Sequence, residues 1–406
     1  MHESYLPPHE GTPSPNRTLD TQVTSRLREA MVADITTRYA IRPPAILTAL
    51  RTVPRHLFLP GIALDRAYND DAIVTKHDAD GLPTSSASQP AIVAIMLDQL
   101  EAMPGMRVLE IGAGTGYNAA LLAEIVGPQG HVTTVDLDAD VSAAARQHLE
   151  AAGYGPDRVT VICGDGAYGW AEDAPYDRII LTVGAWDVLP HWFAQLIDGG
   201  RIVVPLAIHT VQISAALERH DQTLSSTTLQ PCGFMRLRGP FAGPEILAPL
   251  PETTSIRLLA EPPIPDSARV AALFKTTPRK RALTDTHGAA LRIVLAFMST
   301  EVVSLLSHPP HPLLGYHATG ILTPDGDAAC VLAGESGSDQ LALLEYGTSN
   351  AAQHFEQVVG EWRAIGSPSL SQWSMQLYPK GTMPPPQQPA FSLVPKEHWD
   401  ILLSHA

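Results

Sequence analysis

The chain contains few cysteines and no long hydrophobic run. Its cysteines are Cys163, Cys232 and Cys330, scattered along 406 residues. Their odd number and spacing argue against a disulfide framework and against a cysteine metal site, so we expect no metal. No apolar run approaches the roughly 18 residues that span a membrane, and the N-terminal residues lack the basic and apolar regions of a secretory signal. We therefore expect a cytoplasmic protein that does not bind membranes.

Basic residues are also scarce. Lysine and arginine total 27 against 42 aspartates and glutamates, which gives a formal net charge of −15. Nucleic-acid binding requires neutralisation of phosphates, so this balance argues against a nucleic-acid partner. An acidic surface is compatible with a basic protein or peptide partner, although an acidic solvated surface is the commoner explanation. The length allows two domains with a large core.

A strand, a glycine turn and a helix follow one another in the most informative segment. The apolar run 108–111 predicts a buried strand, and residues 118–126 have helical spacing. Between them stand Gly112, Gly114 and Gly116. A Cβ atom there would block the approach of a ligand or forbid the required backbone angle. This order of elements is typical of a nucleotide-binding turn.

The spacing of the turn indicates which nucleotide binds. It is G-x-G-x-G rather than the G-x-G-x-x-G of dinucleotide sites, and Glu110 stands two residues ahead of it. We therefore predict S-adenosyl-L-methionine (SAM), with S-adenosyl-L-homocysteine as product. A second strand, 131–136, ends in Asp136 about twenty residues onward, where such folds bind a ribose. Asp165 and Gly166 follow a third strand, and Asp165 is predicted to receive the adenine amino group.

The strands alternate with helical stretches, and further strands are predicted at 176–183 and 199–205. This order indicates an α/β fold with a doubly wound, mostly parallel sheet, a Rossmann-like SAM-dependent methyltransferase fold with a smaller α+β C-terminal module. The predicted organisation is a disordered segment at 1–22, a methyltransferase domain at 23–240, a proline-rich linker at 241–266 and a C-terminal α+β module at 267–406 that recognises substrate. In that module we predict helices at 267–276, 287–306 and 349–365 and a hairpin around Asp325-Gly326.

Four motifs in order make the prediction more specific. They are the segments 51–60 (RTVPRHLFLP), 67–70 (AYND), 86–90 (SASQP) and 108–116 (VLEIGAGTG). Together they resemble the protein-L-isoaspartate O-methyltransferase family, from about residue 34 to about residue 240. The resemblance implies transfer of a methyl group from SAM to a carboxylate of a polypeptide. A carboxylate is already ionised at neutral pH, so the reaction requires no catalytic base.

By this resemblance, Ser88 matches the active-site serine, which lies between the cofactor and the carboxylate. Ser86 and Gln89 flank it and are expected to bind substrate, although the segment departs from the family's usual Thr-Ile-Ser. Trp186 stands in a loop that also departs from the family, either as a platform for substrate or as loop packing. A serine-rich stretch without the surrounding motifs would be interpreted as a flexible loop.

The chain continues well beyond residue 240, and this extension leaves three hypotheses open. Similar enzymes with an extension accompany ribosomally made modified peptides, and the resemblance implies methylation of an aspartate in a constrained precursor peptide, with later closure of the ester to an aspartimide. Alternatively, the protein is an L-isoaspartyl repair methyltransferase whose extension stabilises it. The third hypothesis is a SAM-binding adaptor without catalysis.

Overall fold

The structure is a computed structural model that describes residues 21–79, 81–253, 256–283, 288–334, 341–383 and 392–405. The chain divides into two compact units, 1–166 and 167–406. Most of the segment predicted to be disordered, residues 1–20, lies outside the described residues. No helix in the described ranges has both the length and the apolar character required to cross a membrane.

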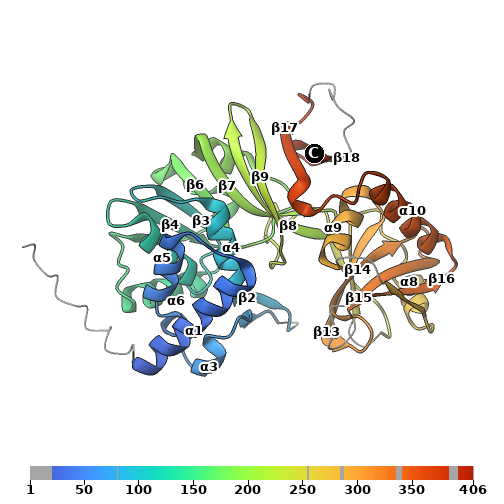
Figure 1. The fold of residues 1–406 in the computed structure, drawn as a ribbon, viewed down its shortest axis with the longest axis horizontal. Helices are drawn as coiled ribbons and strands as arrows, with labels where there is room; N and C mark the ends of the chain where they lie inside the picture. Colours follow the sequence, from blue (N-terminus) through green and yellow to red (C-terminus); the bar gives the residue numbers. More distant parts are fainter. Residues whose placement is uncertain are drawn as a thin grey trace, which may run out of the picture. The chain divides into compact units, whose positions relative to one another are not determined.

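Helices build much of the first unit (Figure 1). The first begins where Thr21 and Thr24 form a reciprocal capping box, which satisfies free amides at the helix start. Its Met31, Val32 and Ile35 are buried. The predicted helix after the glycine turn is also confirmed. The helices are α1 (Gln22–Tyr39), α2 (Pro44–Thr52), the short 3-10 helix η2 (Arg55–Phe58), α3 (Leu64–Ala67), α4 (Pro90–Leu100), α5 (Tyr117–Val126) and α6 (Ala139–Ala151).

Three parallel strands of the first unit carry the predicted cofactor motifs. They are β3 (Arg107–Ile111), β4 (His131–Asp136) and β5 (Val159–Cys163), neighbours in the order β5-β4-β3. Ile111 is paired with Val135, and Asp136 with Cys163, so the carboxyl ends of the strands meet at one edge. A separate antiparallel hairpin consists of β1 (Ile73–His77) and β2 (Pro83–Ala87).

The second unit contains parallel strands followed by antiparallel ones. Its neighbours run β6, β7, β8, β9, β17, β19, β18, and only β6 and β7 are parallel to each other. Leu377 of β17 is paired with Leu224 of β9, so strands from the end of the chain cover an edge begun before residue 240. The elements are β6 (Tyr176–Leu181), α7 (Pro190–Gln195), β7 (Leu196–Ile208), β8 (Val211–His220), β9 (Thr223–Pro231), β17 (Trp373–Pro379), β18 (Ser392–Pro395) and β19 (Trp399–His405).

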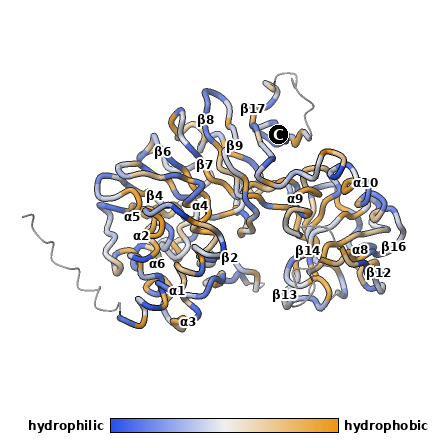
Figure 2. The backbone as a smooth tube through the Cα atoms, viewed as in Figure 1, coloured by the Kyte–Doolittle hydropathy of each residue, from blue (hydrophilic) through white to orange (hydrophobic). Residues whose placement is uncertain are grey.

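A seven-stranded antiparallel sheet forms the rest of the second unit, in the order β10-β11-β13-β14-β15-β16-β12. Figure 1 shows α8 and α10 beside its strands, and hydrophobic residues recur along its elements (Figure 2). Its core includes Leu258, Val331 and Phe274. The elements are β10 (Ile246–Pro249), β11 (Ile256–Ala260), α8 (Ser267–Phe274), β12 (Arg279–Leu283), α9 (Gly288–Met298), β13 (Val302–His311), β14 (Gly315–Leu322), β15 (Ala328–Gly334), β16 (Leu341–Gly347) and α10 (Asn350–Ala364).

These elements test several predictions. The Rossmann-like fold and the hairpin around Asp325-Gly326 are confirmed, since β14 and β15 flank that turn. The predicted helix 287–306 is wrong beyond Met298, because Val302 and Val303 instead pair with β14. Residues 241–266, predicted as a linker, contribute β10 and β11 to the sheet. The domain boundaries themselves stay a prediction.

Candidate functional site

The glycine turn has the backbone that its sequence predicts. Gly112, Gly114 and Gly116 have φ angles of 100°, 51° and 87°, a region that residues with a Cβ atom rarely adopt. The amide of Gly114 donates a hydrogen bond of 3.0 Å to Oδ2 of Asp136. The turn and the acid at the end of β4, predicted to bind one cofactor, therefore lie in direct contact.

The end of β5 lies beside this acid. The amide of Gly164 donates to the main-chain oxygen of Asp136 at 2.9 Å, and half-buried Asp165 follows it. A Cβ atom on Gly166 would lie 2.5 Å from a methyl carbon of Ile111, so only glycine allows this close packing against β3. The three strand ends thus bring Asp136, Asp165 and Gly166 to one edge.

Glu110 lies below the turn and is fully buried. Its carboxylate accepts hydrogen bonds from Asn118 of α5 at 2.8 Å and from Thr134 of β4 at 2.6 Å. Burial raises its pKa to about 7, although both hydrogen bonds act in the opposite direction. Glu110 therefore joins β3, β4 and α5 beneath the turn, and a direct contact with the cofactor stays a prediction.

The segment that carries the predicted active-site serine passes close to the turn. A Cβ atom on Gly114 would lie 3.4 Å from the main-chain oxygen of Ser86. The main-chain oxygen of Ser88 accepts a 2.9 Å hydrogen bond from Nη2 of Arg55, which is fully buried. The same guanidinium donates to the main-chain oxygen of Ala67. The sequence analysis missed this role for Arg55, although the residue stands in the motif 51–60.

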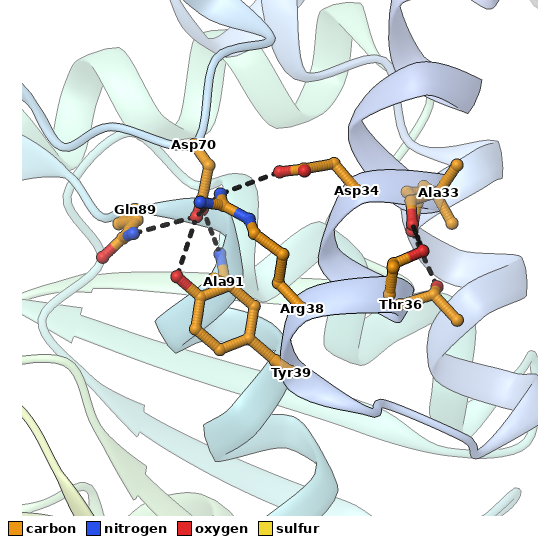
Figure 3. Close-up of polar contacts among 10 residues, drawn as sticks. Ala33, Asp34, Thr36, Arg38, Tyr39, Asp70, Gln89 and Ala91 are labelled. Atoms are coloured by element: carbon orange, nitrogen blue, oxygen red, sulfur yellow. Dashed lines mark hydrogen bonds and ion pairs between the residues drawn. The ribbon is translucent and has the colours of Figure 1, made fainter.

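Asp70 fixes the chain just after Ser88 (Figure 3). Its carboxylate accepts from Nε2 of Gln89 at 2.9 Å and from the amide of Ala91 at 2.8 Å, and it forms an ion pair with Arg38 at 2.8 Å. The bond from Ala91 satisfies a free amide at the start of α4. The side-chain amide of Gln89 is thus engaged by Asp70, while its contact with substrate stays a prediction. Asp70 is the last residue of the motif AYND, and its place in that motif is the signal in the sequence that could have indicated this anchoring role.

Trp186 belongs to the second unit, where residues of the extension surround it. Its indole nitrogen donates to Oε1 of Glu261 at 2.8 Å, and the ammonium of Lys396 lies 4.3 Å from its ring centroid. The amide of His398 donates to Asp187, the next residue of the Trp186 loop, at 2.7 Å. These contacts account for loop packing, and a platform for substrate stays a prediction.

Charged groups gather around this tryptophan, and burial changes their pKa values. The Lys396 side chain is 1% exposed and its ammonium lies 3.8 Å from Glu261, and burial lowers the lysine pKa. Burial alone would raise the pKa of Glu261, but hydrogen bonds from His209 and Trp186 bring it to about 2. Burial raises the pKa of Asp187 to about 6.

The residues of the first unit fit the predicted cofactor. The glycine turn leaves main chain uncovered by side chains, Asp136 offers a carboxylate for ribose hydroxyls, and Asp165 offers an acceptor for an amino group. When bound, SAM supplies an electrophilic methyl group. The chain's own residues would hold it in place and orient a carboxylate toward it.

The chain is similar in sequence to known proteins. The family described as protein-L-isoaspartate(D-aspartate) O-methyltransferase matches residues 26–240, more than half of the chain. The protein-L-isoaspartate O-methyltransferase of Hyperthermus butylicus is 37% identical, over 53% of this chain and 89% of its own length. The enzyme of the same name from Methanopyrus kandleri is 38% identical, over 54% of this chain and 95% of its own length.

A solved structure named protein-L-isoaspartate O-methyltransferase is also similar. It covers 86% of this chain and 96% of its own, at 25% identity and a TM-score of 0.51. The matched range 26–240 spans the turn, Asp136 and Ser88. The chain therefore belongs to the protein-L-isoaspartate(D-aspartate) O-methyltransferase family and is a SAM-dependent carboxyl methyltransferase.

Proposed function

We propose that the enzyme methylates the free carboxylate of L-isoaspartyl residues in proteins and peptides, as a repair methyltransferase. One observation carries this choice of substrate. The similar solved structure, itself named a protein-L-isoaspartate O-methyltransferase, covers 86% of this chain, which is more than the matched residues 26–240 alone. Much of the extension thus has a counterpart in a protein of that name. The extension therefore gives no reason to favour a different substrate.

The proposed reaction depends on placement rather than on proton transfer. The substrate carboxylate is ionised at neutral pH and attacks without a base. Holding two reacting groups at attack distance can contribute roughly 7–11 kcal/mol. We assign to the Ser88 hydroxyl a hydrogen bond that orients this carboxylate once water has been excluded. The hydrogen bond from buried Arg55 fixes the main chain that presents the hydroxyl.

The role in modified peptides is the second candidate for the substrate. The features that favour it are the extension and the altered serine segment, Ser86 to Ser88. The closure of a methyl ester to an aspartimide would follow methylation in either case, because methanol is a better leaving group than a carboxylate oxygen. The substrate that accepts the methyl group therefore distinguishes the two candidates.

Mass spectrometry with matched substrates tests this proposal. A linear peptide with one isoaspartyl residue, the same peptide with aspartate and a cyclised aspartyl peptide are each incubated with enzyme and SAM. We expect the mass of one methyl group to be added to the isoaspartyl peptide alone. Methylation of the cyclised aspartyl peptide alone would overturn the repair function in favour of peptide modification. Methylation of none, with SAM bound, would favour the non-catalytic adaptor.

The variant Ser88→Ala separates catalysis from cofactor binding. Loss of the hydroxyl removes the proposed hydrogen bond to the carboxylate, so we expect a roughly hundredfold lower kcat, as for other donors at a reacting oxygen. Affinity for S-adenosyl-L-homocysteine, measured by calorimetry, should stay close to that of the wild type. A wild-type kcat would exclude Ser88 from the active site.

A further inference from the structure

We propose that Lys76 is a positioning residue that ties the serine hairpin, which consists of β1, β2 and Ser88, to the acidic loop of the cofactor site. The inference rests on the cofactor site assigned above to the glycine turn. Lys76 stands on β1, and its ammonium donates to Oδ2 of Asp138 at 2.8 Å and to Oδ1 of Asp140 at 2.7 Å. Both aspartates lie at the start of α6, next to Asp136.

The contacts of Lys76 close a ring around the assigned site. The amide of Asp138 donates to Oδ1 of Asp136 at 3.2 Å, and the other oxygen of Asp136 accepts from Gly114 at 3.0 Å. Gly114 in turn faces the main chain of Ser86. Ser86 is paired with Val74, two residues before Lys76. Hairpin, acidic loop and glycine turn therefore position one another.

The hairpin requires such a tie because it is a sheet of two strands only. A two-stranded hairpin alone is marginally stable in water, so side-chain contacts decide where it lies. The register of β1 and β2 shifts on both sides of Lys76. Such irregularities redirect side chains in antiparallel sheets. Arg55 anchors the end of the hairpin at Ser88, and Lys76 anchors the strand that leads into it.

Three carboxylates, those of Asp136, Asp138 and Asp140, gather at this loop, and the Lys76 ammonium bonds two of them. The Asp138 side chain is 16% exposed, so its charge is only partly screened by water. Without the ammonium, Asp138 would repel Asp136 and shift the carboxylate assigned to the ribose. The proposed consequence is weaker cofactor binding, with a smaller loss of rate from the looser serine segment.

The test compares Lys76→Met with the matched control Arg51→Met, which removes another partly exposed ion pair of the same unit, that with Glu29. We expect faster hydrogen exchange of the amides of β1 and β2 in the ligand-free protein for Lys76→Met alone. Its affinity for S-adenosyl-L-homocysteine should fall about fivefold, the upper range for a partly exposed ion pair. KM for SAM should rise more than kcat falls, and Lys76→Arg should restore both readouts.

Unchanged exchange and unchanged affinity in Lys76→Met would overturn the inference. Asp136→Asn shows whether the cofactor site itself is at fault. If Asp136→Asn loses affinity and Lys76→Met does not, the tie is wrong and the site stands. If neither variant loses affinity, the assignment of the cofactor site is wrong. Both variants change half-buried side chains, and their thermal unfolding shows whether they fold as the wild type does.

Discussion

Two lysines hold carboxylates beside loops of the predicted site, one in each unit, and they differ in burial. The Lys76 side chain is 32% exposed and donates to two aspartates. The Lys396 side chain is 1% exposed, and its ammonium finds no hydrogen-bond partner in the described part of the chain. It lies instead over Trp186 and near Glu261.

This difference in burial indicates different roles. The contacts of Lys76 position a site, whereas those of Lys396 stabilise the fold. Water can replace Lys76 at its aspartates, so its loss costs little stability. Water cannot replace Lys396, and its loss would leave Glu261 with His209 and Trp186 but without the nearby ammonium. The residues of the extension are thus part of the fold around the Trp186 loop.

Deletion of residues 373–406 is expected to cause the largest loss of stability, and it tests whether the fold requires the extension. It removes β17, which covers the edge of β9, and Trp399, whose indole donates to the main-chain oxygen of Val188 at 2.7 Å. It also removes the buried side chains Met375 and Ile401. We expect an insoluble protein or one without cooperative thermal unfolding, measured by circular dichroism. A soluble deletion variant that unfolds cooperatively would break the comparison, because the extension would then be dispensable.

The variant Gly114→Val tests whether the region near Lys76 is a cofactor site. Its φ angle of 51° strains any residue with a Cβ atom, and the side chain would crowd the main chain of Ser86. We expect loss of detectable S-adenosyl-L-homocysteine binding by calorimetry. The control is Gly105→Val, since Gly105 has a φ of 87° but nothing within 4 Å of its Cβ position. Equal affinity of the two variants for S-adenosyl-L-homocysteine would show that the glycine turn is not the cofactor site.

The variants Lys396→Met and Lys76→Met sharpen the comparison directly. Methionine keeps most of the side-chain volume and removes the charge. We expect Lys396→Met to lower the free energy of unfolding by about 1–3 kcal/mol, because Trp186 loses a desolvated cation over its ring and Glu261 loses one of its partners. Lys76→Met should lower it much less, because water replaces the contacts of a partly exposed ion pair. Urea unfolding at neutral pH measures both, and equal losses would contradict the distinction.

A smaller effect concerns Glu110, the buried carboxylate of the first unit, which two neutral donors hold. Its folded pKa of about 7 lies above its ordinary value of 4.5. The folded state therefore binds the proton more tightly, and the stability from this group falls as pH rises from 4.5 to about 7.

Glu110→Gln should remove this dependence. We expect the free energy of unfolding to differ less between about pH 5 and about pH 8 in the variant than in the wild type. The pKa of Asp187 is also raised, to about 6, but Asp187 is present in both proteins. Its contribution to the pH dependence of stability therefore does not affect the comparison between them. An unchanged difference between the two pH values would show that Glu110 does not titrate in this range.

The sequence by itself determined the cofactor half of the molecule. The strand, the turn of Gly112 to Gly116 and the helix are local patterns. Parallel strands bring their carboxyl ends to one edge, so Asp136 and Asp165 could be predicted to lie near the turn. The family followed from four short motifs, and the family match over residues 26–240 confirmed it.

Only the tertiary structure decided the contacts between distant residues. Lys76 and Asp138 are 62 positions apart, and Trp186 and Glu261 are 75 apart. No local period encodes such pairs, because hydrophobic spacing tells which face of an element is buried and not which element covers it. The pairing of β17 with β9, and the strand that follows Met298 in place of a helix, were decided in the same way.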